Sequence, residues 1–259
     1  MLTLNKLYSI LDEYAPFEIS RQIIKEGGYD NSGILIKQHD SVCKIMFALD
    51  ISVDVVKRAK RLGCDTVITH HPAIYNPITS LSIDNADKKA LILAIKENIN
   101  VISMHLNLDI ADGGIDQSLA EGLGGKTFKI LEYITEKNGY GREFEVEETT
   151  LLQYKNKVKT KFNTQKVITY GKKNTVIKKV ASFCGAGGSS ALNYSGDADL
   201  IVTSDLAHHV ILALIERGKN LMIIPHYVAE IYGFKRFYER VKKEIADLQF
   251  TFFEDKRFR

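Results

Sequence analysis

Short apolar runs alternate with amphipathic stretches along the first half of the chain. The runs predict strands at Lys44–Leu49, Thr66–Thr69 and Val101–Met104. The amphipathic stretches predict helices over Leu4–Tyr14, Val53–Leu62, Asp87–Glu97 and Gly113–Leu123, the last ending at Gly124 and Gly125. Short strands separated by helices of about 10–12 residues are typical of βαβ units and a mostly parallel sheet.

The same alternation returns after Lys178. Apolar runs there predict strands at Val180–Phe183, Leu200–Thr203, Leu221–Ile224 and Phe250–Phe253. Helices are expected over Leu206–Arg217 and Tyr227–Ile245, with a short helix after the glycine-rich segment 185–190. The fold class is therefore predicted to be α/β, and the shared alternation of the two halves indicates two α/β lobes.

The segment between these halves differs in its charge. Glu132–Glu148 contains six glutamates and two basic residues, whereas Leu151–Ser182 contains nine lysines and no acidic residue. One interpretation is a solvated, strand-rich module with opposite charges on neighbouring segments. The other is a basic patch for a phosphate backbone, although the lysines lack the interleaved aromatic residues typical of a single-strand binder.

The composition is that of an ordinary globular protein. Of the 259 residues, 45% are hydrophobic and 26% charged, and the net charge of +3 indicates neither a nucleic-acid nor a membrane partner. The three cysteines lie far apart, which favours a reducing compartment. The N-terminus lacks the pattern of a signal peptide, and no apolar run approaches the ~20 residues of a membrane span. We expect a cytoplasmic protein.

Histidines and carboxylates follow several predicted strands. His70 and His71 come directly after Thr66–Thr69, at the carboxyl end of a strand, where open α/β sheets bind their ligands. Neighbouring side chains on a regular strand point to opposite faces, so both rings can converge only if the strand breaks, and Pro72 supplies that break. The alternative is a pair of turn histidines without a function.

Two further pairs follow other strands. His105 and Asp109 come after Val101–Met104; Asp109 is expected in a loop, with a turn or helix-capping role as the alternative. His105 either binds a metal directly or orients Asp109, and we favour the second role. His226 and Glu230 are spaced i, i+4 at the start of the last long helix, a spacing that puts both on one helix face.

Together, these residues predict a metal site. Imidazole and carboxylate ligands favour zinc, iron or manganese over calcium. Five ligands exceed the usual number for one catalytic zinc, so we expect two divalent metal ions with a shared carboxylate. The five predicted ligands are His70, His71, Asp109, His226 and Glu230.

Four ordered motifs carry a family resemblance. YDNSG (Tyr29–Gly33), ITHHP (Ile68–Pro72), HLNLDIADGGID (His105–Asp116) and PHYVAE (Pro225–Glu230) resemble motifs of the NGG-interacting-factor-three-like family, which includes bacterial GTP cyclohydrolase 1 type 2 homologues. The resemblance implies two α/β lobes, a C-terminal helix that returns to the first lobe, and a toroidal homohexamer. It also implies a dinuclear site at the five residues named above.

The expected domains are a metal-binding lobe of residues 1–127 with 221–259 and a second lobe of residues 128–220. Two positions depart from the family pattern. Tyr29 stands where the family usually has a tryptophan, which we interpret as a mild change at a packing residue, and Leu106 replaces a common threonine.

The resemblance leads to a mechanistic hypothesis. Two divalent ions would lower the pKa of a bridging water, and the resulting metal-bound hydroxide would attack C8 of the imidazole ring of a purine nucleotide such as GTP. Two hydrolytic steps would release formate. We expect Glu230 or Asp109 to bridge the ions and His105 to move protons or support the site.

Two alternatives come from other functional classes. One is a ring-shaped binding or scaffold protein that holds nucleic acid or a protein partner without turnover. The other is a metal-delivery or metal-sensing protein with exchangeable ions.

Two other segments have more than one interpretation. The backbone amides of Gly185–Ser190 could hold a phosphate, or the segment could be a tight strand-to-helix turn. Asp205 is expected to cap the following helix, and the alternative is a contribution to the pocket together with His208.

Overall fold

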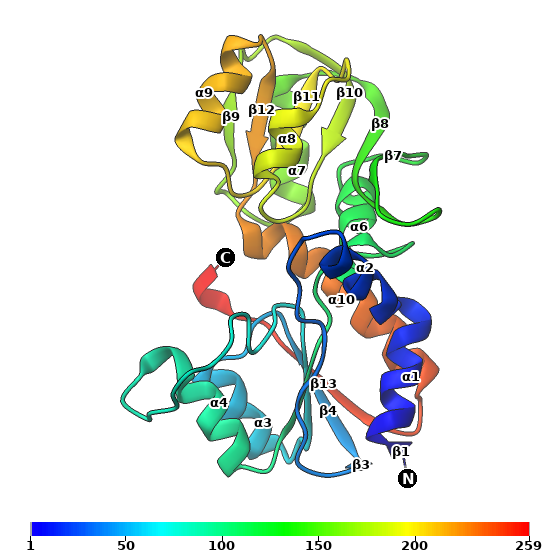
Figure 1. Cartoon of the computed structure of the whole chain (residues 1–259). Coiled ribbons are helices and arrows are strands. Elements are labelled where there is room, and N and C mark those ends of the chain that lie inside the picture. Colours follow the sequence, from blue (N-terminus) through cyan, green and yellow to red (C-terminus); the bar gives the residue numbers. More distant parts are fainter. Residues whose placement is uncertain (1, 259) are drawn as a thin grey trace. The chain divides into compact units, whose positions relative to one another are not determined.

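The alternation of strands and helices becomes two large sheets in the computed structural model, which describes residues 2–258 (Figure 1). The chain divides into two compact units. The first contains the residues up to Ala111 together with Phe234–Glu254, and the second contains Asp112–Gly233 and the residues from Asp255. The predicted α/β class with two lobes is confirmed. The units end at different residues from the predicted lobes, whose boundaries stay a prediction.

The first unit is built on a five-stranded sheet in the order β13-β4-β5-β6-β2. Strand β2 pairs antiparallel with β6, whereas β13, β4, β5 and β6 are parallel to their neighbours. Its elements are β1 (Leu2–Thr3), α1 (Leu4–Tyr14), α2 (Phe17–Lys25), β2 (Gly33–Ile36), β3 (Ser41–Val42), β4 (Lys44–Ala48), α3 (Val53–Leu62), β5 (Thr66–Thr69), α4 (Ala86–Lys96), β6 (Asn100–Ser103), α5 (Leu106–Ile110) and β13 (Gln249–Phe253).

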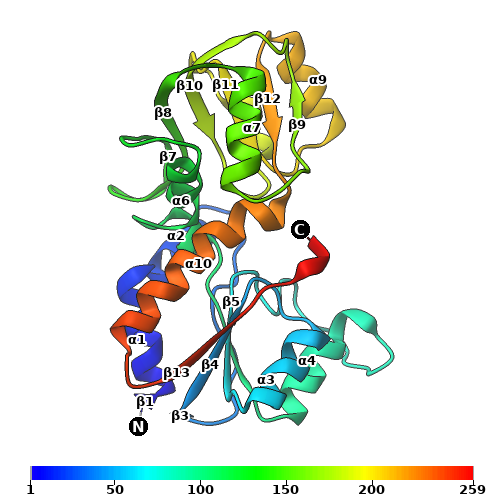
Figure 2. The ribbon, with the colours of Figure 1, turned by 180° about the vertical axis from the view of Figure 1, so that it is seen from behind.

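Helices cover both faces of this sheet, with α3 and α4 on one side and α1 on the other (Figures 1 and 2). Alternate side chains of β4 explain this arrangement, because successive residues of a strand point to opposite faces. Met46 belongs to the core formed with α3 and α4. Phe47 instead packs its ring against the rings of Phe234 and Phe237, which lie on α10 (His226–Glu244). Both faces of the strand are therefore buried, as in other parallel sheets.

The second unit is built on a six-stranded sheet in the order β7-β8-β10-β11-β12-β9. The three central strands are parallel, and antiparallel strands flank them on both sides. Its elements are α6 (Ile115–Gly122), β7 (Lys129–Tyr133), β8 (Gly139–Thr150), α7 (Leu151–Lys161), β9 (Ile168–Tyr170), β10 (Val176–Ser182), α8 (Gly188–Asn193), β11 (Leu200–Thr203), α9 (His208–Glu216), β12 (Asn220–Ile223) and the short helix η1 (Lys256–Phe258).

Helices α8 and α9 cover one face of this second sheet, and α7 covers the other (Figures 1 and 2). The core under α8 and α9 contains Phe183, Ile201 and Leu214. Helix α10 begins in the second unit and ends in the first, which confirms the predicted return of the C-terminal helix.

The charged segments of the second unit lie side by side. The glutamate-rich strand β8 pairs antiparallel with β10, and Lys178 Nζ lies 2.7 Å from Glu148 Oε2. Lys179 is similarly paired with Asp197 at 2.7 Å. Opposite charges thus occupy neighbouring segments, as the first interpretation expects. None of the helices between residues 2 and 258 is both long enough and apolar enough to cross a membrane.

Candidate metal centre

Two parallel strands of the first unit end side by side in polar residues. Thr69 at the end of β5 pairs with Ser103 at the end of β6, and their hydroxyl oxygens lie 2.8 Å apart. The Thr69 hydroxyl also donates to the main-chain oxygen of His71. This anchors the chain immediately after β5, which ends at Thr69, and it fixes the backbone that carries the two histidines.

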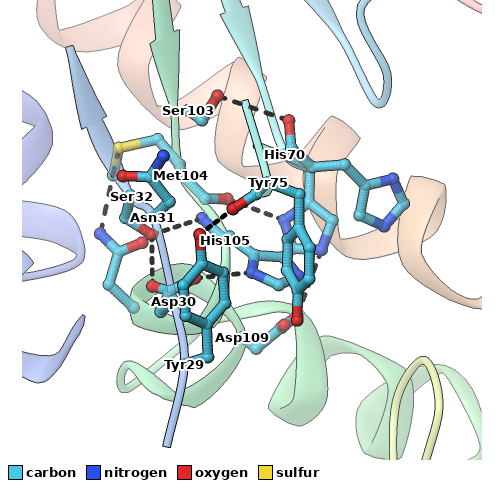
Figure 3. Close-up of polar contacts among 12 residues, drawn as sticks. Tyr29, Asp30, Asn31, Ser32, His70, Tyr75, Ser103, Met104, His105 and Asp109 are labelled. Atoms are coloured by element: carbon cyan, nitrogen blue, oxygen red, sulfur yellow. Dashed lines mark hydrogen bonds and ion pairs between the residues drawn. The ribbon is translucent and has the colours of Figure 1, made fainter. Parts of the chain in front are cut away.

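His70 is completely buried at this edge. Its Nδ1 lies 2.7 Å from the main-chain oxygen of Met104, the residue after β6 (Figure 3). A carbonyl oxygen can only accept a hydrogen bond, so Nδ1 must carry the hydrogen and the lone pair of the neutral ring is on Nε2. This is the tautomer of a histidine that binds a metal through Nε2.

Two more histidines of this unit are held through the same ring atom. His71 Nδ1 lies 2.6 Å from Asp50 Oδ1, and His105 Nδ1 lies 2.7 Å from Asp30 Oδ1. The ring centroid of His70 lies 4.8 Å from that of His71 and 5.4 Å from that of His105. The predicted convergence of His70 and His71 is therefore present, with each ring oriented by an oxygen acceptor.

The Asp30 carboxylate is itself buried and fixed. Its Oδ2 accepts a hydrogen bond from the Ser32 hydroxyl at 2.7 Å. Burial acts to raise the pKa of Asp30, but hydrogen bonds from His105, Ser20 and Ser32 outweigh it and hold the pKa below its ordinary value. Asp30 is thus a stable anion that orients His105.

Asp109 completes a donor set in the first unit. It lies on the short helix α5 and is buried, so its expected placement in a loop is wrong. Asp109 Oδ1 lies 3.5 Å from His70 Nε2. One donor atom from each of His70, His105 and Asp109 falls within 4.8 Å of the others. Ligands at ~2.0–2.2 Å from an ion stand at most about 4.4 Å apart, so these three residues could hold a metal after a small contraction.

A second donor pair lies in the second unit. His226 Nε2 is 2.7 Å from Glu230 Oε1, one turn along α10, and His226 Nδ1 is 2.6 Å from Asp205 Oδ2. Gly185 packs against this pair with φ +60°, and a Cβ at this position would lie 2.6 Å from Glu230 Oε1. The sequence therefore needs glycine here, both for its backbone conformation and for the close approach of the carboxylate.

The role expected for Asp205 needs correction. The residue that caps α9 is Ala207, which makes no side-chain capping bond, and the Asp205 carboxylate holds His226 instead. His208 is exposed at the start of α9. In the tight turn after β10, Gly187 N donates to Thr203 Oγ1 at 3.2 Å.

Three carboxylates orient histidines, and only Asp205 was singled out from the sequence, for a capping role; Asp30 and Asp50 were overlooked. Asp50 and Asp205 each come two residues after a strand, as His71 and His105 do. Asp30 stands inside the YDNSG motif. The available signals were therefore a carboxylate shortly after a buried strand for Asp50, and membership of the YDNSG motif for Asp30.

A family model described as Duf34/NIF3 (NGG1p interacting factor 3) matches residues 2–257. The chain belongs to this family. A protein of Clostridium perfringens named GTP cyclohydrolase 1 type 2 homolog is 30% identical over 259 residues, covering 96% of this chain and 95% of that protein. The Protein NIF3 homolog of Schizosaccharomyces pombe is 26% identical and covers 76% of each chain.

Two solved structures share the fold. The hypothetical protein SA1388 of Staphylococcus aureus has a TM-score of 0.84 and 26% identity, covering 98% of this chain and 97% of that one. Reduced HcgD from Methanocaldococcus jannaschii has a TM-score of 0.81 and 25% identity, covering 98% of both. The match to the family model confirms the family that the four motifs resemble.

Proposed function

We propose that the protein is a dinuclear metal-dependent hydrolase that opens the imidazole ring of a purine nucleotide, with GTP as the first candidate substrate. The observation that carries this proposal is the common orientation of four histidines. His70, His71, His105 and His226 each face an oxygen acceptor through Nδ1, so Nε2 is the nitrogen that would bind a metal. At His226 this atom faces the carboxylate of Glu230 at 2.7 Å, which is the other proposed ligand on the same helix. The names of the bacterial relatives support the choice of a purine nucleotide.

The proposed ligands are His70, His71 and Asp109 from the first unit and His226 and Glu230 from the second. Their donors fit divalent zinc, iron or manganese, which accept imidazole nitrogen and carboxylate oxygen. When bound, two such ions would supply Lewis-acid activation of water near neutral pH. Either Asp109 or Glu230 would bridge the ions, because a carboxylate offers two oxygens.

His105 is the proposed proton carrier. Its Nδ1 is held by Asp30, so only Nε2 is available to take a proton from the attacking water and return it to the leaving ring nitrogen. Its place beside His70 and Asp109 also allows direct ligation. The metal content of a His105→Ala variant separates the roles: a proton carrier leaves it unchanged, and a ligand lowers it.

The first test is the metal content per chain, measured by elemental mass spectrometry on protein purified without chelators or a metal-affinity column. We expect about two divalent ions per chain, lost in the His71→Ala/Glu230→Ala double variant. His209→Ala is the matched control, because His209 is exposed and is not a proposed ligand. A chain that stays empty after metal is added back would contradict the dinuclear site.

The second test is formate release from GTP by the metal-loaded protein. Turnover that needs metal and is lost in the double variant supports the hydrolase. Bound metal without turnover would favour a metal-containing scaffold for nucleic acid or protein, or a metal-delivery protein. Salt-sensitive oligonucleotide binding that is lost when the lysines of 155–179 are neutralised would identify the scaffold.

We also propose a toroidal homohexamer, following the family resemblance. Light scattering coupled to size-exclusion chromatography should give a mass six times that of the chain. A monomeric mass at micromolar concentration would contradict it.

A further inference from the structure

Two tyrosine rings lie exposed beside the histidines of the first unit. The exposed fraction is 44% for Tyr29 and 49% for Tyr75, and their ring centroids are 4.9 Å apart at an interplanar angle of 70°. Single exposed aromatic residues are common on protein surfaces, but a contacting pair is an apolar patch that water solvates poorly. Tyr29 packs against Tyr75, and nearly half of its side chain is also open to a ligand.

The patch is fixed in place from both sides. The Tyr29 hydroxyl donates to the main-chain oxygen of Tyr75, and Asn31 Nδ2 donates to the main-chain oxygen of Ile74 at 2.5 Å. These bonds attach the segment after α2 to the irregular chain that follows β5. Asp30, between the two donors, holds His105 (Figure 3). One short segment thus positions both the tyrosine pair and an imidazole of the donor set.

The tyrosine pair is one ring away from the candidate metal ligands. The centroid of Tyr75 lies 6.3 Å from that of His105, and the two rings are nearly perpendicular at 88°. The centroid of His105 in turn lies 5.9 Å from that of His71. A flat ligand that contacts the tyrosine pair would therefore lie next to the residues expected to carry the reaction.

We propose that Tyr29 and Tyr75 form the surface that recognises the flat ring of the ligand, a planar nitrogen heterocycle of the purine type. This inference rests on the proposed function for the choice of ring, and it adds the residues that select it. Aromatic side chains stack on bases because every base has a polarisable face, and the attraction does not depend on the metal. The rings meet at an angle, so one can stack on the heterocycle while the other meets its edge.

The absence of tryptophan from the sequence provides a clean probe. Tyr75→Trp and Tyr29→Trp each create a single tryptophan that keeps an aromatic face in the pair. We expect guanosine monophosphate to quench the fluorescence of this tryptophan saturably. Ribose 5-phosphate, which lacks the base, should leave the fluorescence unchanged. Tyr133→Trp is the matched control, because Tyr133 is a 63% exposed tyrosine of the second unit.

Removal of the ring gives the converse test. Tyr75→Leu should weaken guanosine monophosphate binding, measured by calorimetry, about 5- to 150-fold, the range for loss of one base stack. Tyr29→Phe keeps its ring and loses only the hydroxyl, so its binding should weaken less. If circular dichroism shows that Tyr75→Leu is unfolded, two other measurements test the recognition surface. Tyr75→Phe should keep its affinity, and the tryptophan variants should be quenched by guanosine monophosphate.

The outcomes separate this inference from the proposed hydrolase. Quenching by guanosine monophosphate without formate release from GTP supports the recognition surface and contradicts the proposed hydrolase. Formate release with an unchanged KM in Tyr75→Leu overturns the recognition surface alone. Equal quenching by ribose 5-phosphate also overturns the recognition surface. So does a Tyr75→Leu variant that keeps its affinity for guanosine monophosphate but loses its oligomeric mass, because the tyrosine pair would then contact a second copy of the chain.

Discussion

The two units both contain three adjacent parallel strands, but they differ in the number of candidate metal donors that follow these strands. Each has three adjacent parallel strands, β4-β5-β6 in the first and β10-β11-β12 in the second. In the first unit, residues after two of these strands supply His70, His71, His105 and Asp109. The second supplies one histidine and one carboxylate on a single helix turn. Three parallel strands are therefore compatible with a cluster of donors such as His70, His105 and Asp109, but they do not require one.

The units also differ in where they bury ionised groups. In the first, the buried Asp30 faces a histidine of the donor set. In the second, the completely buried Asp116 pairs with Arg142, whose Nη1 lies 2.9 Å from Asp116 Oδ2, and it also accepts from Cys184 N at 3.1 Å. Asp30 of the first unit therefore orients a histidine of the candidate site, whereas Asp116 of the second unit joins α6 to β8.

The largest expected effect is a loss of stability when the ion pair between Asp116 and Arg142 is broken. Arg142→Met leaves the Asp116 charge buried without its partner, so we expect the free energy of unfolding to fall by about 3–5 kcal/mol in urea denaturation. The matched control from the first unit is Arg21→Met, which breaks an exposed ion pair with Glu18 and should cost at most about 1 kcal/mol. Similar losses in both variants would show that the Asp116 pair is no more important than a surface pair.

Next in size is the loss of a carboxylate that orients a histidine. Asp50→Asn in the first unit and Asp205→Asn in the second should each lower metal affinity about 10- to 100-fold, measured by competition with a chelator. The effect should be smaller for Asp205, whose side chain is 66% exposed against 46% for Asp50, because water can replace an exposed acceptor. Asp247→Asn, at an exposed position away from the histidines, is the control. Unchanged affinity in both variants would contradict the orienting role.

The smallest effect is a pH dependence specific to the second unit. Burial raises the pKa of Asp116 to about 6, against the opposing influence of Arg142. The native state therefore binds a proton before the unfolded state does as the pH falls from 7 to 4.5, and this proton stabilises the native state. Asp116→Asn cannot titrate. The unfolding free energy of the wild type minus that of the variant should thus increase by on the order of 1 kcal/mol between pH 7 and pH 4.5. A constant difference would contradict the raised pKa.

Much of the fold was predictable because the chain's pattern is locally consistent. Helix α3 and strands β5 and β11 have the predicted bounds, since each is a short apolar or amphipathic segment between clear turn residues. Helix α7 was not predicted, because its lysines obscure the few buried positions that give it a face. Helix α5 was also missed, because a five-residue helix has almost no periodicity to detect.

The candidate ligands followed from the sequence for a similar reason. A histidine or carboxylate directly after an apolar run must lie at a strand end, and parallel strands bring their carboxyl ends to one edge. The acceptors that orient the histidines could not be predicted from the sequence. Met104 acts through a main-chain oxygen, which has no side-chain signal, and Asp30 lies 75 residues from the ring it holds.

The sequence by itself determined the α/β class, the strand ends and the chemical type of the donors, because these depend on local pattern and residue identity. Only the tertiary structure decided which nitrogen of each ring is held, that Asp109 is buried on a helix, and that Tyr29 and Tyr75 meet beside His105. Those features depend on contacts between residues distant along the chain, and hydrophobic periodicity carries no information about such contacts.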